Sequence, residues 1–100
     1  MAHNDYVPFN GLRGKPLEEV ELKILWLYGH NDTPAKIAER LEITISTVVT
    51  YLKYARCKLG SYTSWCAYEK AKRLMLFRIL SKSSNPKFRI DFPPPLKLHS

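Results

Sequence analysis

The stretch TPAKIAERLEITISTVVTYLKYARCKLG, residues 33–60, decides the fold because it predicts two helices joined by a very short turn. Thr33 is a favourable N-cap and Pro34 suits the first helical position, so a short helix begins here. Glu42 and Ile43 follow this helix as a tight turn. The buried stripe of the short helix is predicted at apolar positions three and four residues apart, namely Ile37, Ala38 and Leu41.

The second helix of this pair begins after Thr44, which caps it, and ends before Gly60, a residue that commonly terminates helices. Its apolar positions are spaced for one helical face and are Val48, Leu52, Ala55 and Leu59. The opposite side contains no acidic residue and is predicted to be exposed: Ile45, Ser46, Val49, Thr50, Lys53, Tyr54 and Arg56. Two short helices in this arrangement have the dimensions of a helix-turn-helix, whose second helix can enter the major groove of DNA.

Helices are predicted on both sides of this pair. The earlier one shows helical periodicity from Leu17 to Tyr28, and Gly29 or Asn31 can adopt the left-handed conformation that ends it. The later one begins after Thr63 or Ser64 and is predicted to continue to about Leu80.

The predicted fold class is therefore all-α, with four helices in a domain at residues 17–81. Glycines and prolines interrupt residues 1–16, which are predicted to form an irregular N-terminal arm. Residues 82–100 are a basic, proline-rich tail, extended at Pro93, Pro94 and Pro95. Residues 87–92 alternate charged and apolar side chains, which suits an edge strand or a docking segment.

Charge is distributed unevenly along the 100 residues, whose net charge is +7. Residues 1–50 hold five basic and seven acidic side chains, whereas residues 51–100 hold eleven basic and two acidic ones. Such a positive half favours a polyanionic partner, and nucleic acid is the commonest one. The sequence offers no membrane-spanning stretch and no secretory signal, so we expect a cytoplasmic protein.

The sequence carries no arrangement typical of catalysis or metal binding. Cys57 and Cys66 are too widely spaced for a Cys-x-x-Cys pair, and the three histidines are scattered, so both cysteines are interpreted as small apolar residues. No paired carboxylates and no phosphate-binding glycine loop are present. We therefore expect no enzyme activity, no cofactor, no metal and no small-molecule substrate.

Residues 17–71 resemble the four-helix DNA-binding domain of the LuxR, FixJ and GerE regulators, and they align with it without gaps through Gly60. The matching stretches are Leu17 with Glu21, Ile24-Leu25 and Leu27, the block Ile37-Ala38-Glu39-Arg40-Leu41-x-Ile43-Thr44-x-Ser46-Thr47-Val48, and Lys58-Leu59-Gly60. The resemblance covers a little over half the chain. Val49 stands where the family usually has Lys and Tyr51 where it often has His, so the family's base preference does not carry over.

The resemblance implies that the helix at residues 44–59 lies in the major groove of duplex DNA. It places Val49, Thr50 and Lys53 at base edges, and Thr47, Tyr51 and Lys58 near phosphates. The complete predicted DNA-binding set is Thr44, Ser46, Thr47, Val49, Thr50, Tyr51, Lys53, Tyr54 and Lys58. It further implies a homodimer formed through the fourth helix by Trp65, Tyr68, Ala71, Lys72 and Met75. Trp65 and Tyr68 are interpreted as either core or dimer-interface residues.

The function implied is that of a sequence-specific transcriptional regulator. No sensor domain fits into residues 1–16, so the chain resembles the stand-alone GerE type, and its control is expected to come from its abundance or from a partner protein. Three alternatives to DNA contact stay open. The basic residues of the helix at 44–59 could simply form a solvated face. Val49 could pack against the N-terminal arm, and Tyr51 could be partly buried.

A second hypothesis is an interaction module that pairs with another LuxR-type regulator or with RNA polymerase, without binding DNA itself. The long apolar stretch from Leu74 to Leu80 motivates it. A sigma factor's promoter-recognition domain shares the helix-turn-helix and ranks lower, because the ending Lys58-Leu59-Gly60 favours the LuxR type.

Overall fold

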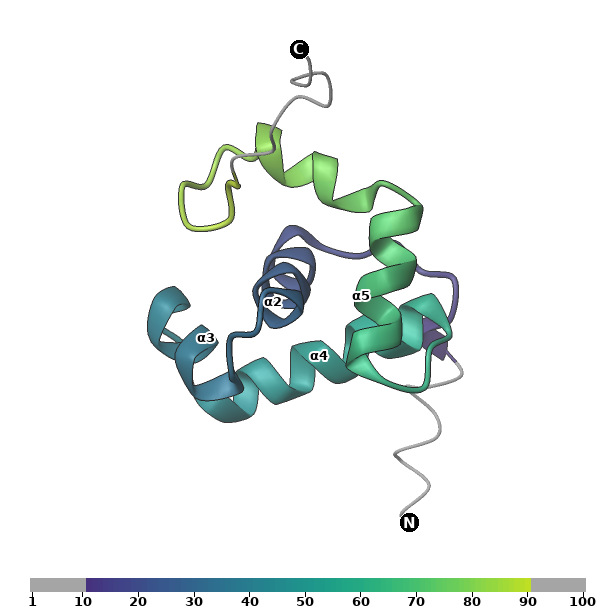
Figure 1. Ribbon diagram of the computed structural model, residues 1–100, viewed down its shortest axis with the longest axis horizontal. Coiled ribbons are helices and arrows are strands. Elements are labelled where there is room, and N and C mark those ends of the chain that lie inside the picture. The colour runs from purple at the N-terminus through teal and green to yellow at the C-terminus, as the bar shows by residue number, and fades with distance from the viewer. Residues whose placement is uncertain (1–10, 91–100) are drawn as a thin grey trace.

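The computed structural model describes residues 11–90, which form an all-α fold with no strand in that range. Residues 1–10 and 91–100 lie outside the described residues, and with them most of the predicted arm and the three consecutive prolines. The elements are α2 (Glu19–Gly29), α3 (Pro34–Leu41), α4 (Ile45–Leu59), α5 (Ser64–Arg73) and the 3-10 helix η2 (Leu76–Lys82). In Figure 1, α4 crosses below α2 while α5 and η2 cover α2 from the other side.

The predicted helix ends of the central pair are confirmed. The Oγ1 atoms of Thr33 and Thr44 accept the backbone N–H groups of Lys36 and Thr47, at 3.2 and 3.1 Å. Gly60 follows α4 with φ +64° and lets Ser61 donate its N–H to the carbonyl of Arg56, which closes the helix end.

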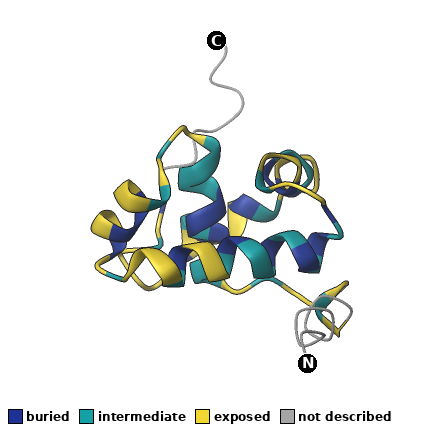
Figure 2. Ribbon diagram, turned by 90° about the horizontal axis from the view of Figure 1, so that it is seen from below, coloured by how far each residue is buried: buried dark blue, intermediate teal, exposed yellow. Residues whose placement is uncertain are grey.

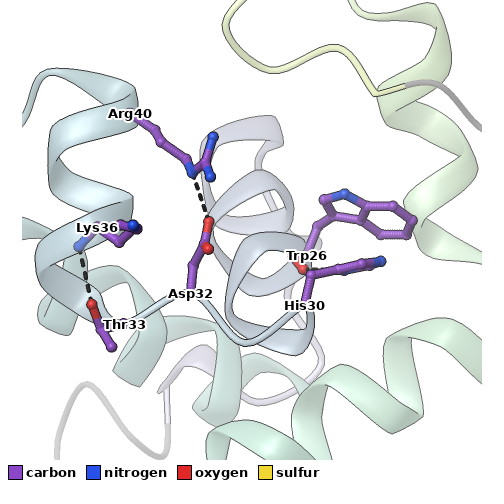
Figure 3. Close-up of polar contacts among 6 residues, drawn as sticks. All are labelled: Trp26, His30, Asp32, Thr33, Lys36 and Arg40. Carbon is purple, nitrogen blue, oxygen red and sulfur yellow. Dashed lines mark hydrogen bonds and ion pairs between the residues drawn. The ribbon is translucent and has the colours of Figure 1, made fainter.

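The link between α2 and α3 is equally well defined. Asn31 adopts φ +74°, as expected for the residue that ends α2. A salt bridge of 2.8 Å then joins the Arg40 guanidinium to Asp32 Oδ2 (Figure 3). It links the residue shortly before α3 to the last turn of that helix. His30 Nδ1 lies 2.8 Å from the carbonyl oxygen of Trp26, which anchors the ring at the end of α2.

The core lies where α2 meets α4, α5 and η2. Its fully buried side chains come from all five elements, and the largest are Leu22, Ile24, Leu25, Ile37, Val48, Cys57, Phe77 and Leu80. Figure 2 shows the consequence for α4, whose exposed residues are concentrated in its N-terminal half.

The prediction of one continuous helix up to Leu80 is wrong. α5 ends at Arg73, and Met75 adopts φ +61° before the chain continues as η2. This bend turns the chain back over α2, so that Phe77 is fully buried with its ring centroid 5.3 Å from that of Trp26 and 5.4 Å from that of Tyr68. A straight helix would carry this phenylalanine past the core.

The compact unit also extends beyond residue 81, where the predicted domain ended. Ile90 is buried in the core and donates its N–H to the carbonyl of Leu80. Ser83 donates to Glu19 Oε1 at 2.8 Å, and the Lys23 ammonium donates to the carbonyl of Arg89 at 3.1 Å. Residues 83–90 are therefore part of the fold, and the described part of residues 87–92 packs as an irregular docking segment instead of an edge strand.

Candidate nucleic-acid interface

The turn between α3 and α4 is tight, as predicted for Glu42 and Ile43. Glu42 adopts the left-handed conformation at φ +60°, a position that usually favours glycine. Ile43 donates its N–H to the carbonyl of Ala38 at 3.0 Å, and Glu42 donates to that of Glu39. Ala38 is buried and Ile43 packs against the core. These contacts and the two hydrogen bonds fix the orientation of α4 relative to α3.

The inward face of α4 is the one predicted from the sequence. The predicted positions Val48, Leu52, Ala55 and Leu59 are all buried. Cys57 is buried as well, which the simple periodicity did not indicate. With this side of the helix fixed to the core, the rotation of α4 and hence its outward face are determined.

The outward face of α4 is apolar and hydroxyl-rich. Ile45 and Val49 are each 51% exposed, although both are large aliphatic residues. Ser46 and Thr50 are also exposed, and Lys53 and Tyr54 are half-buried at the same side. Apolar carbons and hydroxyls are the groups that meet thymine methyls and base edges in a major groove. Val49 is thus presented to solvent, although any contact with residues 1–10 lies outside the described residues.

Three other predicted positions are partly engaged within the protein. The hydroxyls of Thr44 and Thr47 lie 2.8 Å apart and share a hydrogen bond at the start of α4. Tyr51 is half-buried against the core, with its ring in an edge-on contact with that of Tyr54 at 6.2 Å. The open alternative of a partly buried tyrosine is therefore the observed one, with the ring serving as a support for Tyr54.

Lys58 does not occupy the place that the resemblance implies. Its Nζ lies 2.7 Å from Glu21 Oε1, and the two side chains are 9% and 2% exposed. The same carboxylate oxygen accepts the backbone N–H of Glu18 at 2.8 Å. Lys58 is thus one half of a buried ion pair between α2 and α4, and we correct its assignment as a phosphate contact.

The electrostatic character of α4 is positive. Residues 45–59 contain no acidic side chain. Burial raises the pKa of the Cys57 thiol, and the nearby charges of Arg56 and Lys53 oppose this by a smaller amount. The Arg56 guanidinium also donates to the carbonyl of Tyr62 at 3.2 Å, which holds its charge near the C-terminal end of the helix.

The predicted dimer face divides into two sets. Tyr68 and Ala71 are buried within the monomer. For Tyr68 this is the core alternative left open by the sequence, and Ala71 has no exposed surface to offer a second copy. Gly29 explains the position of Tyr68, because a Cβ there would overlap the tyrosine ring, so this glycine admits α5 rather than only ending α2. Trp65, Lys72 and Met75 are exposed, with the Lys72 ammonium 5.4 Å from the centre of the Tyr68 ring.

The two cysteines differ in exposure, although the sequence predicts the role of a small apolar residue for both. Cys57 is buried and serves as an apolar core residue, whereas Cys66 is exposed on α5. Within residues 11–90, no three His, Cys, Asp or Glu side chains gather in a group that could hold a metal ion. None of the helices in that range combines the length and apolar character that a membrane crossing requires.

Comparisons with protein-family models, with curated proteins and with solved structures found no significant match to this chain.

Proposed function

We propose that this protein is a transcriptional regulator that binds duplex DNA by inserting α4 into the major groove. The observation that carries the proposal is the outward face of α4, which is exposed, free of acidic residues and fixed in rotation by the buried opposite side. Because carboxylates are repelled by DNA, an exposed helix without them suits a polyanionic groove. The sequence resemblance of residues 17–71 to LuxR-type domains supports the same function.

Within this proposal, the base-reading residues are Val49 and Thr50, with Ile45, Ser46, Lys53 and Tyr54 around them. Lys53 is the lysine of α4 that belongs to this face, and it is half-buried. Thr44 and Thr47 mark the N-terminal end of α4, where backbone N–H groups and the helix dipole attract phosphate oxygens. Lys58 is excluded because its charge is neutralised by Glu21 in the interior.

The proposed homodimer would use the exposed members of the α5 set, Trp65, Lys72 and Met75. A regulator that reads two half-sites needs such pairing, because two-fold symmetry of the operator mirrors that of the protein. Sedimentation of the protein with and without its DNA measures the mass directly, and a change of Trp65 to Ala should lower the dimer fraction.

Selection of bound sequences from a random duplex pool, followed by an anisotropy titration at several salt concentrations, tests the proposed function. We expect the logarithm of the binding constant to fall with a slope of about −0.9 per phosphate contact. Lys53→Ala should weaken binding by about 1–3 kcal/mol if it meets a base. A flat salt response, or a pool that yields no enriched sequence, would contradict the proposal.

The second candidate is an interaction module without DNA affinity. Its support is the exposure of Leu74, Met75 and Ile79 at and after the bend that follows α5. Capture of a transcription regulator or of RNA polymerase by the protein, combined with no DNA binding in the titration above, would favour it.

A further inference from the structure

An open groove of about 430 Å³ lies away from the outward face of α4, between residues 13–17, the C-terminal end of α4, and the bend that joins α5 to η2. Its walls come from four separate parts of the chain, and six of its lining side chains are aliphatic: Leu17, Leu22, Leu59, Leu74, Leu76 and Ile79. A volume of this size is within the range of small-molecule sites, which extends from about 300 to 1,000 Å³.

The two sides of the groove are held in position by specific backbone features. On one side, the N–H of Gly14 donates to the carbonyl of Lys58 at 3.0 Å, which fixes residues 13–15 to the end of α4. On the other side, the left-handed Met75 redirects the chain, so that Leu74 and Ile79 remain 55% and 49% exposed instead of entering the core. The groove is therefore a consequence of the bend and leaves an aliphatic surface uncovered within residues 11–90.

The charges around the groove are of one sign. Its lining includes Arg13, Lys15, Lys58 and Lys70 but no carboxylate from the described residues. Glu21 neutralises Lys58 from behind, and the Lys70 ammonium donates one of its three protons to the carbonyl of Leu59 at 2.8 Å. Arg13 and Lys15 are exposed, so positive charge remains at one side of an otherwise aliphatic surface.

We propose that this groove binds an anionic amphiphile, namely a single-chain carboxylate such as a medium-length fatty acid. The alkyl chain covers the exposed Leu74 and Ile79 and removes their aliphatic surface from water. The carboxylate meets the guanidinium of Arg13, whose fork matches two carboxylate oxygens, together with the ammonium groups of Lys15 and Lys70. A purely apolar occupant would leave these cations unpaired, and a cationic one would be repelled by them. This proposal stands independently of DNA binding.

Calorimetric titration of the full chain with dodecanoate, below its micelle concentration, tests the proposal. We expect saturable binding of one dodecanoate per chain. Each methylene removed from the ligand should weaken binding about fourfold, since a buried methylene contributes about 0.8 kcal/mol. Dodecyltrimethylammonium, which has the same alkyl chain and the opposite charge, should bind at least about tenfold more weakly.

Matched variants locate the site. Ile79→Glu places a carboxylate at the groove, and Ile45→Glu makes the same change at an isoleucine of nearly equal exposure, 51% against 49%, on α4. Only the first should weaken dodecanoate binding, by about tenfold or more, because like charges repel at short range. Lys15→Ser should weaken it as well, whereas Lys36→Ser on α3 should not.

Three results would overturn the proposal. The first is an absence of saturable dodecanoate binding by the full chain, which would also follow if another segment of this chain fills the groove. The second is equal affinity for the anionic and cationic amphiphiles, and the third is an equal loss in the Ile79 and Ile45 variants. Sedimentation of the unliganded chain at the titration concentration adds one more outcome: a dimer abolished by Ile79→Glu would assign the groove to a second copy instead.

Discussion

Lys58→Met tests whether the two lysines of α4, Lys53 and Lys58, have different roles. Lys58 is paired with Glu21 at 2.7 Å, and both side chains are buried. Removing one partner leaves the other charge without compensation in the interior, which costs about 3–5 kcal/mol. A protein of this size unfolds with a free energy of about 5–15 kcal/mol, so the single variant should lose a large part of it. We expect its urea midpoint to fall by about 2 M.

The double variant Glu21→Met/Lys58→Met separates the ion pair from packing. Exchange of a buried ion pair for apolar residues of similar volume is often neutral. The hydrogen bond from the Glu18 N–H to Glu21 Oε1 is also lost, at a cost of about 1 kcal/mol. The double variant should therefore unfold within about 2 kcal/mol of the unaltered protein, and a double-mutant cycle should give a strong coupling between the two positions.

Lys53→Met is the matched control, since it removes the same charge from the same helix five residues earlier. It should lower the urea midpoint by less than Lys58→Met does and weaken DNA binding, whereas the double variant should bind DNA as the unaltered protein does. A Lys58→Met protein with an unaltered midpoint would refute the buried pair. A double variant that folds but binds DNA as weakly as Lys53→Met would return Lys58 to the interface. Even if the single variant fails to fold, the double variant decides the question.

Three further predictions address other parts of the molecule. Replacing the contacted thymines by deoxyuridine should weaken DNA binding about fourfold per methyl group in anisotropy titrations, because a buried methyl contributes about 0.8 kcal/mol. The same replacement should weaken binding of a Val49→Ala protein by a smaller factor; an equal factor for both proteins would exclude Val49 as a base-contacting residue. Iodoacetamide should label Cys66 within minutes and Cys57 only on unfolding, because burial both shields the Cys57 thiol and raises its pKa, so mass spectrometry that finds two labels on the native chain would contradict the fold. Glu42→Gly should be about 0.5–1 kcal/mol more stable than Glu42→Gln in thermal unfolding. Both variants lose the exposed salt bridge to Lys87, but only glycine adopts the left-handed conformation without steric strain, so equal melting temperatures would show that this turn carries no strain.

The local features of the fold were predictable from sequence, because their causes lie within a few residues of one another. Thr33 and Thr44 cap their helices through hydrogen bonds that span three residues. The spacing of Val48, Leu52, Ala55 and Leu59 reflects the period of a single helix, which is fixed by backbone geometry alone. The outward face of α4 follows from the inward one, so most of the candidate interface was predicted together with the helix.

Features that depend on partners distant in sequence were missed. The Lys58 ammonium meets a carboxylate 37 positions earlier, and nothing in the pattern of α4 distinguishes this lysine from an exposed one. Ser83 and Arg89 bind α2 across 64 and 66 positions, so the apparent tail is part of the unit. Tyr68 shares the buried face of α5 with Ala67 and Ala71, and the space for its ring is provided by Gly29, 39 positions earlier.

The break after α5 has a different origin. Residues 74–80 contain leucine, methionine, phenylalanine and isoleucine, which suit a helix as well as any other structure, and no proline or glycine indicates a stop. The chain bends at Met75 because Phe77 and Leu80 gain full burial against α2 only if the direction changes. Tertiary burial of these two side chains outweighs the cost of a left-handed methionine, which is about 1–2 kcal/mol.

The positions of Lys53 and Lys58 show why net charge alone indicates a partner but not a contact. Both lysines belong to α4, but the Lys58 side chain is 9% exposed and paired with Glu21, whereas Lys53 is half-buried on the outward side. One of them faces the core, where a carboxylate from α2 neutralises it, and it adds nothing to the field outside. The attraction that this chain exerts on a polyanion must therefore come from cations on the outer sides of its helices, and the measured salt slope should count those cations and leave Lys58 out.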